Sequence, residues 1–363
     1  MLDPSDKQQS PVSEDEPAEA DEGNEYSGEY ADETALEEVE AVEEAVAAPA
    51  PPVKEPEPPR VRKLDIVGRR NWFFLLSLII IIPGIISMTT RHFLLGIDFA
   101  GGTETTVSFS NNPPLNTVES AVAAENVGGT VISTGGGGYI IRTDVLSPTA
   151  ENKLIADLDK NVGPIDRSKL SILSVGGTIA KETIEFALLA VVLASIAILL
   201  LLAIRFRNVP GGWRAGFQFG GSALAALLHD VFLLTGLFSI MGAVLGWHIA
   251  EIDSLFVTAV LTVVGFSVHD TIVVFDRIRE NLRVSQRLSF EQVVNLSIMQ
   301  TAARSIITSF TVVLVLVAIL WAGGPTLKGF ALALVIGIVS GTYSSIFNAA
   351  PLLVVWRRLQ PVR

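Results

Sequence analysis

The chain has 363 residues, of which 49% are hydrophobic and 18% are charged, and its mean hydropathy is +0.48. A hydropathy this high is unusual for a soluble domain and indicates a membrane protein. The sequence contains no cysteine, which excludes disulfides and thiol catalysis.

The net charge of −12 is distributed unevenly. Residues 1–60 contain 19 acidic side chains against Lys7, Lys54 and Arg60, so the rest of the chain is mildly basic. This first segment is rich in Glu, Ala and Pro and has few large apolar residues. Because such a composition buries too little surface to offset the entropy of ordering, residues 1–60 are predicted to form a disordered acidic tail.

Six apolar segments of membrane-spanning length follow the tail, each close to or longer than the roughly 20 residues that a helix needs to cross a bilayer. They lie at residues 72–88, 186–204, 217–245, 254–275, 306–321 and 330–356. The sequence therefore predicts a polytopic α-helical membrane protein. The first helix with its flank occupies residues 61–90, the other five occupy 183–356, and 357–363 form a C-terminal tail.

Lysine and arginine gather on alternate sides of these segments. They are dense in "RVRKLDIVGRR", "RFRNVPGGWR", "RIRENLRVSQR" and "WRRLQPVR", whereas "GWHIAEID" and "WAGGPTLKG" together hold only Lys328. Because positively charged loops stay on the cytoplasmic side, both termini are predicted to be cytoplasmic, with the protein in the cytoplasmic (inner) membrane.

Residues 91–182, between the first and second helices, are predicted to form a small α+β domain outside the cytoplasm. Strand and helix patterns alternate there in the order βαββαβ, which is typical of a ferredoxin-like sandwich. Ser147 is a plausible N-cap of the second helix. The four glycines at 135–138 occupy the position of a hairpin turn, and no helix start follows them as a phosphate-binding loop requires.

Five ionisable side chains interrupt the apolar segments, and each costs at least a few kcal/mol in hydrocarbon unless it is paired or functional. They are His229, Asp230, His269, Asp270 and Arg304. Asp270 and Arg304 are each 17 residues from Arg287 in the loop between spans four and five, so they can reach a common depth. Asp270 and Arg304 are the predicted core of a proton pathway, with Asp230 and His269 as further candidates. A purely structural reading, in which these groups only hold helices together, stays open for each.

Small residues indicate where the helices pack closely. Thr258, Thr262, Gly265 and His269 recur at helical spacing on span four, and Gly337 and Gly341 form a similar pair on span six. Small side chains allow membrane helices to approach each other, so Gly265, Gly337 and Gly341 are predicted packing positions.

Five ordered motifs from Asn71 to the C-terminus resemble the SecD/SecF family of protein translocase subunits, and in particular its SecF members. They are "LLGIDFAGGTETTVSF", "LLHDV", "VHDTIVVFDRIREN", "RSIITS" and "GGPTLKGFALALVIGIVSGTYSSIF". The resemblance implies an accessory subunit that works with SecD and with the SecY, SecE and SecG channel on exported preproteins, driven by the proton gradient. In that family an Asp of span four and an Arg of span five belong to the proton pathway, and they match Asp270 and Arg304.

The predicted function is therefore proton-driven assistance of polypeptide export in contact with membrane lipid, without enzymatic activity, cofactor, metal or nucleic acid. A proton-driven small-molecule exporter of the resistance-nodulation-division superfamily and a non-transporting scaffold of the translocon are the alternatives. An intramembrane aspartyl protease using Asp230 and Asp270 is less consistent with the local sequence, because neither aspartate has the flanking residues of such enzymes.

Overall fold

The computed structural model describes residues 65–285 and 287–360. The prediction of a disordered acidic tail at residues 1–60 lies outside these residues. Within them, six helices are long and apolar enough to cross a membrane. Their positions agree with the six predicted spans, and each continues beyond the apolar segment that predicted it.

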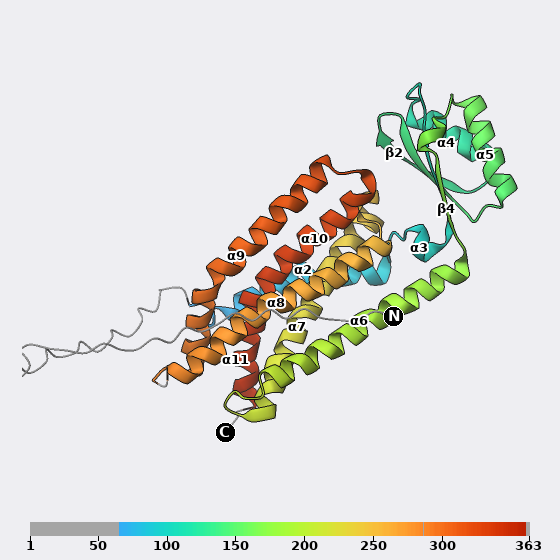
Figure 1. Cartoon of the computed structure of the whole chain (residues 1–363). Coiled ribbons are helices and arrows are strands. Elements are labelled where there is room, and N and C mark those ends of the chain that lie inside the picture. Colours follow the sequence, from blue (N-terminus) through green and yellow to red (C-terminus); the bar gives the residue numbers. More distant parts are fainter. Residues whose placement is uncertain (1–64, 286, 361–363) are drawn as a thin grey trace, which may run out of the picture. The chain divides into compact units, whose positions relative to one another are not determined.

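The six membrane helices are built from nine helical elements, some joined without a break. They are α2 (Arg70–Thr90), α6 (Gly177–Arg205), α7 (Gly212–Ser239) with the π-helical turn η2 (Ile240–Val244), α8 (Ser254–Val284), α9 (Phe290–Ala322), and α10 (Pro325–Ser344), which continues through the π-helical turn η4 (Ser345–Ala349) into α11 (Ala350–Leu359). The helices α8, α9 and α10 run side by side (Figure 1).

Local chemistry fixes the starts of the two helices that carry the predicted proton pathway. The side chain of Asp253 accepts a hydrogen bond from the Phe256 amide and caps α8. Ser289 and Gln292 form a reciprocal capping box at the start of α9. Such caps satisfy amides that the helix itself leaves unpaired, so both helices have defined first turns.

The α+β domain lies between α2 and α6 in the chain and has the predicted βαββαβ order. After the short helix α3 (Ile97–Ala100) come β1 (Gly102–Ser108), α4 (Leu115–Ala124), β2 (Gly129–Gly135), β3 (Gly138–Thr143), α5 (Pro148–Asn161), the 3-10 turn η1 (Arg167–Lys169) and β4 (Ser171–Val175). The strands form one antiparallel sheet in the order β2-β3-β1-β4, which is the ferredoxin-like arrangement.

Two sequence details of this domain are confirmed. The β2–β3 hairpin turns at Gly136 and Gly137, whose φ angles of 59° and 75° favour glycine. The side chain of Ser147 accepts a hydrogen bond from the Ala150 amide at the start of α5. These two connections set the register of β2 against β3 and the start of the second helix.

The two faces of the sheet differ. One face packs against α4 and α5 through a core that includes Val107, Ile141, Val118 and Leu154 (Figure 1). The other face presents Glu104, Ile132, Ile140 and Arg142 and has no helix of the domain on it. Strand residues point alternately to opposite sides, so this second set is free to meet other parts of the chain.

Candidate functional site

The carboxylate of Asp230 is the most heavily hydrogen-bonded group inside the membrane helices. Asp230 lies on α7 and is only 1% exposed. Its Oδ1 accepts from Ser340 at 2.7 Å, and its Oδ2 accepts from Ser267 at 2.7 Å and from Ser344 at 2.6 Å. The donors come from α8 and α10, so one carboxylate holds three helices together.

His229 completes the surroundings of Asp230. Its Nδ1 lies 3.0 Å from Oδ1 of Asp230, and a proton on Nδ1 allows the ring to donate to the carboxylate. Its Nε2 is buried and has no hydrogen-bond partner among the described residues. The ring borders a cavity of about 230 Å³ that is also lined by Ser77 and Asn348. His229 therefore contacts Asp230 through one ring nitrogen and has its other ring nitrogen buried without a partner among the described residues.

Asp270 is the second buried carboxylate and lies near the middle of α8, 6% exposed. Its Oδ1 accepts a 2.5 Å hydrogen bond from Ser305 on α9, and its Oδ2 accepts a 2.5 Å bond from Ser345 at the start of η4. No cation contacts Asp270 within the part of the chain that the structure describes. The carboxyl group is thus held by hydroxyls alone.

The predicted ion pair between Asp270 and Arg304 is not formed. The predicted depth is right, because Ser305, the residue after Arg304, contacts Asp270. Consecutive residues on an α-helix point about 100° apart, so Ser305 faces α8 while Arg304 is exposed. The spacing of Asp270 and Arg304 from the loop predicts their level along the helices, but it does not determine the rotation of α9.

His269 also lies apart from the buried cluster. It is exposed on α8, whereas Asp270 beside it is buried. The predicted packing stripe on the same helix has the same orientation: Thr258, Thr262 and Gly265 are exposed, and a Cβ at Gly265 would meet no atom within 4 Å. The prediction that Gly265 packs against another helix is thus not met inside this chain.

The glycines of span six do lie at close helix contacts. A Cβ at Gly337 would overlap the side chain of Val263, with its nearest atom only 2.1 Å away. A Cβ at Gly341 would lie 3.1 Å from the Cβ of Ser267, which donates to Asp230. Close approach of α10 to α8 is therefore what brings the serines within reach of Asp230.

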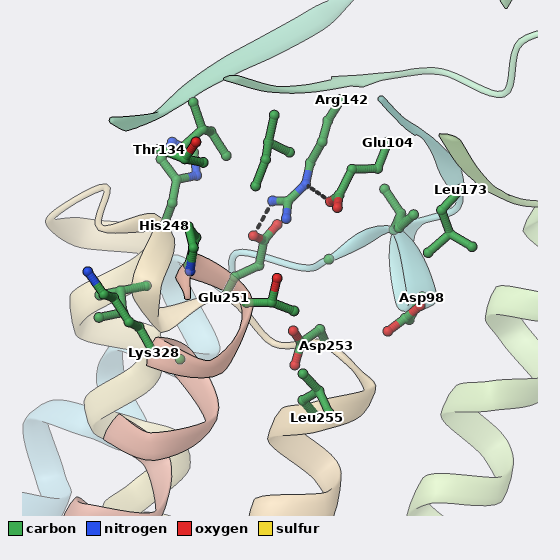
Figure 2. Close-up of a pocket in the computed structure, with 18 of the residues that line it drawn as sticks. Asp98, Glu104, Thr134, Arg142, Leu173, His248, Glu251, Asp253, Leu255 and Lys328 are labelled. Carbon is green, nitrogen blue, oxygen red and sulfur yellow. Dashed lines mark hydrogen bonds and ion pairs between the residues drawn. The ribbon is translucent and has the colours of Figure 1, made fainter. Parts of the chain in front are cut away.

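A second polar cluster lies in a cleft between the open face of the sheet and the membrane helices. Arg142 extends from β3, donates from Nε to Glu104 on β1 at 2.7 Å and donates from Nη1 to Glu251, which precedes α8 (Figure 2). The cleft has a volume of about 440 Å³. His248 at the 3-10 turn η3 (His248–Ala250) and Asp253 also border it (Figure 2).

Burial and charge perturb the titration of this second cluster. Burial raises the pKa of the Glu251 carboxyl above 4.5 despite the opposing charge of Arg142. Burial alone would lower the pKa of Arg142, but its bonds to Glu251 and Glu104 outweigh it and raise the pKa. Burial and the charge of Arg142 both lower the pKa of His248 below 6.5. Arg142 is therefore a fixed positive centre between two carboxylates.

The backbone joins the domain to α8 beside this cleft. Leu95 and Ile252 form a parallel bridge, in which the Gly96 amide donates to Ile252 at 2.8 Å and the Ile252 amide donates to Leu94 at 2.9 Å. The Oδ2 of Asp98 accepts from the amide of Ser254, the first residue of α8, at 2.8 Å. The helix that carries Asp270 is thus bonded to the domain at its first turn.

Sequence reasoning missed the partners of both clusters. Ser340 and Ser344 are four residues apart in an apolar helix, and this helical spacing was a usable signal for a polar face. The contact between Arg142 and Glu251 joins residues 109 positions apart and has no local signal. No group of three or more His, Asp or Glu side chains suited to a metal ion is found across residues 65–285 and 287–360.

Comparison with known proteins identifies the family. Residues 154–359 match the model of the protein export membrane protein SecD/SecF C-terminal region, and residues 86–113 match the SecD/SecF GG motif. The chain belongs to the SecD/SecF family. The membrane helices α6 to α11, all of β4 and most of α5 fall within the first match, and β1 falls within the second.

Curated relatives place the chain among the SecF members of the family. The chain is 44% identical over 306 residues to a protein translocase subunit SecF of Thermobaculum terrenum, covering 81% of this chain and 94% of that protein. It is 40% identical over 297 residues to a SecF of Anaerolinea thermophila, with the same coverage. The match therefore covers nearly the full length of both relatives and about four fifths of this chain.

A solved structure supports the same assignment. The crystal structure of SecDF, a translocon-associated membrane protein from Thermus thermophilus, superimposes with a TM-score of 0.70 at 29% identity. The match covers 81% of this chain and 39% of that SecDF chain. The chain therefore spans about two fifths of the length of the SecDF protein.

Proposed function

We propose that this chain is the SecF half of a SecDF unit that uses a proton gradient to promote export of polypeptides across the cytoplasmic membrane. Its curated relatives are protein translocase subunits, and the solved SecDF chain contains this fold together with a further three fifths of sequence. A separate SecD chain supplies that remaining part, and SecY, SecE and SecG supply the channel for the preproteins.

The observation that carries the proton-coupled function is the environment of Asp270. A carboxylate in the middle of a membrane helix costs about 3 kcal/mol when it is charged and unpaired. Asp270 has two hydroxyl donors and no cation within the described chain. Both the charged and the protonated forms can hydrogen-bond to hydroxyls, so the site accommodates either state.

Arg304 contributes from the adjacent surface. An exposed guanidinium near the middle of a membrane helix is unfavourable against lipid, which supports a protein partner on this side of α9. The exposed polar stripe of Thr262 and His269 on α8 supports the same conclusion. We assign this surface to SecD, and a rotation of α9 by about 100° would exchange Ser305 for Arg304 at Asp270.

The protonation state of Asp270 reaches the domain through α8. The first turn of α8 is bonded to the domain by Asp98 and by the Leu95–Ile252 bridge, and Glu251 just before it binds Arg142. A shift of α8 after proton uptake therefore moves the domain, which lies outside the cytoplasm in this proposal, while both termini lie inside. The domain in turn acts on the emerging polypeptide.

The test is gradient-dependent secretion of a reporter preprotein by membrane vesicles that contain the assembled translocase. Asp270→Asn and Arg304→Met are expected to remove the stimulation by the proton gradient. Asp276→Asn is the matched control, because Asp276 lies on the same helix but pairs with Arg205 and Arg279 at its polar end. Wild-type stimulation in both variants would establish a scaffold in place of a proton carrier.

A further inference from the structure

We propose that Ser344 and Ser345 are positioning residues that couple the two buried carboxylates, so that a proton on Asp270 changes the hydrogen bonds of Asp230. The inference deepens the proposed function because it concerns the same Asp270. It adds Asp230 as the second member of one protonation unit and names the two serines that connect them.

The connection is direct along the chain. Ser344 donates to Asp230 on α7, and the next residue, Ser345, donates to Asp270 on α8. Consecutive side chains on a helix diverge by about 100°, which allows neighbouring serines to face two different helices. A single peptide bond between these serines therefore links the hydrogen bonds of Asp230 to those of Asp270.

The hydroxyl of each serine lies within hydrogen-bond distance of two acceptors. Ser344 Oγ lies 2.6 Å from Asp230 Oδ2 and 3.2 Å from the carbonyl of Gly341. Ser345 Oγ lies 2.5 Å from Asp270 Oδ2 and 3.1 Å from the carbonyl of Thr342. A hydroxyl has one proton to donate, and an ionised carboxylate is the stronger acceptor. When the carboxyl group is protonated, its own O–H donates to the serine, and the serine proton turns to the carbonyl.

These alternative acceptors lie where the helix changes type. Gly341 and Thr342 belong to the last turn of α10, and Ser345 begins the π-helical turn η4. The carbonyl of Gly341 already accepts from the Ser345 amide. A serine proton that turns to these carbonyls competes with the backbone bonds at the junction. Single π-helical turns often occur at functional sites.

A change at this junction is transmitted to the first membrane helix. Asn348 lies within η4, and its Nδ2 donates to Ser77 on α2 at 3.1 Å. Tyr343, just before the junction, donates from its hydroxyl to the carbonyl of Phe73 on α2 at 2.9 Å. Movement of the π-helical turn therefore alters contacts between span six and span one.

The ionisable groups around the pair are few. His229 contacts Asp230 from the same helix, and Tyr343 on α10 lies near the His229 ring, with ring centroids 6.2 Å apart. Between Trp72 and Thr90, α2 has no ionisable residue. On α8 and α9, His269 and Arg304 are exposed and lie away from the cluster. Most of the contacts that change when Asp230 or Asp270 gains a proton are therefore hydrogen bonds from serine hydroxyls.

The experiment measures whether the carboxyl groups titrate together. The full chain, with ¹³C-labelled aspartate, is assembled with unlabelled SecD in bilayer nanodiscs, and the infrared carboxylic acid band is followed against pH. Asp230→Asn and Asp270→Asn assign the two bands. The coupling is the shift in the titration midpoint of Asp230 that Asp270→Asn produces.

In the wild-type background, we expect Asp270→Asn to shift the titration midpoint of Asp230 clearly. In the double variant Ser344→Ala/Ser345→Ala, we expect the same substitution to produce only a small fraction of that shift. Ser239→Ala is the matched control, because Ser239 is fully buried on α7 and donates to His92 at 2.6 Å, away from both carboxylates. This control is expected to keep the full shift. The variant Ser345→Thr, which retains the hydroxyl, is expected to restore the coupling that Ser345→Ala loses.

Two results would overturn the inference. An equally large shift in the double alanine variant means that direct charge repulsion couples the carboxyl groups without the serines. No shift in the wild-type background means that they titrate independently. If the double variant does not fold, Ser345→Ala alone decides between these outcomes. The measurement requires no export, so normal secretion by Asp270→Asn would contradict the proposed function while leaving the coupling measurable.

Discussion

The two acidic clusters of the molecule hold their carboxylates by opposite means. Inside the membrane helices, Asp230 and Asp270 are held by serine hydroxyls, and among the described residues His229 is their only ionisable partner. In the cleft, Glu104 and Glu251 share the guanidinium of Arg142. Hydroxyls bond to both a charged and a neutral carboxyl group, whereas an arginine remains charged and favours the ionised form of its partners.

This difference assigns different roles to the two regions. The hydroxyl-bound acids can take up and release a proton without losing all their partners. The arginine-bound acids form a lasting attachment between the domain and the helices. The proposed function requires both properties, one where the proton is taken up and the other where α8 meets the domain.

The largest effect is expected from Asp230→Ala, which removes the acceptor shared by three serines. Hydrogen bonds inside membrane proteins average about 0.6 kcal/mol, so the loss of the bonds from the three serines and from His229 should destabilise the helices by about 2 kcal/mol. Chemical unfolding in detergent measures this loss. Asp230→Asn keeps an acceptor oxygen and should lose less, and equal losses would show that the serines do not depend on Asp230.

A smaller effect is expected from Gly341→Val, which separates α10 from α8 near Ser267. Overpacking a close helix contact should cost about 1.5 kcal/mol of unfolding free energy and weaken the hydrogen bond from Ser267 to Asp230. Gly265→Val is the control, because a side chain there meets open space within the chain. Equal destabilisation by both valines would show that close packing of α10 does not support the cluster.

The attachment in the cleft is expected to respond to Arg142→Gln. Leaving the buried Glu251 without its cation should weaken the link between domain and helices by about 1 kcal/mol. The Gly96 amide, which donates to Ile252, should then exchange its hydrogen about fivefold faster. Lys153→Gln removes an exposed ion pair with Glu125 in the same domain and should leave this exchange rate unchanged.

The smallest effect is a pH dependence at Glu251. Burial raises its folded-state pKa above 4.5, so its contribution to stability is complete below 4.5 and is lost as the pH rises through the folded-state pKa. As the pH rises from 4.5 through the folded-state pKa of Glu251, the melting temperature of the wild type should therefore fall relative to that of Glu251→Gln. Asp166→Asn should show the opposite trend, because hydrogen bonds from Ser168 lower the pKa of Asp166. A melting-temperature difference between the wild type and Glu251→Gln that does not change with pH would contradict the raised pKa of Glu251.

The sequence predicted most of the fold because its signals are local. Apolar segment length gave the six membrane helices, and alternating patterns gave the βαββαβ order of the domain. Gly136 and Ser147 act where turn and cap chemistry predicted. These features depend on a few consecutive residues, so no knowledge of distant contacts was needed.

The candidate site was predicted less completely because helix rotation is not a local property. Asp230 and Asp270 were identified as buried ionisable residues, yet the sequence does not show which face of α9 meets them. A difference of one residue decides whether Ser305 or Arg304 contacts Asp270. The cluster around Arg142 depends on contacts between the domain and a loop far along the chain, which only the three-dimensional structure reveals.

The bond between Asp98 and the first amide of α8 also has a consequence for biogenesis. The two residues are 156 positions apart, and the membrane helices α6 and α7 and all four strands of the α+β domain lie between them in the chain. During synthesis the strands of the domain are complete before Ser254 is made, so this edge of the domain is unattached until then. The hydrogen bond to Asp98 can form only after the first residue of α8 has been added to the chain.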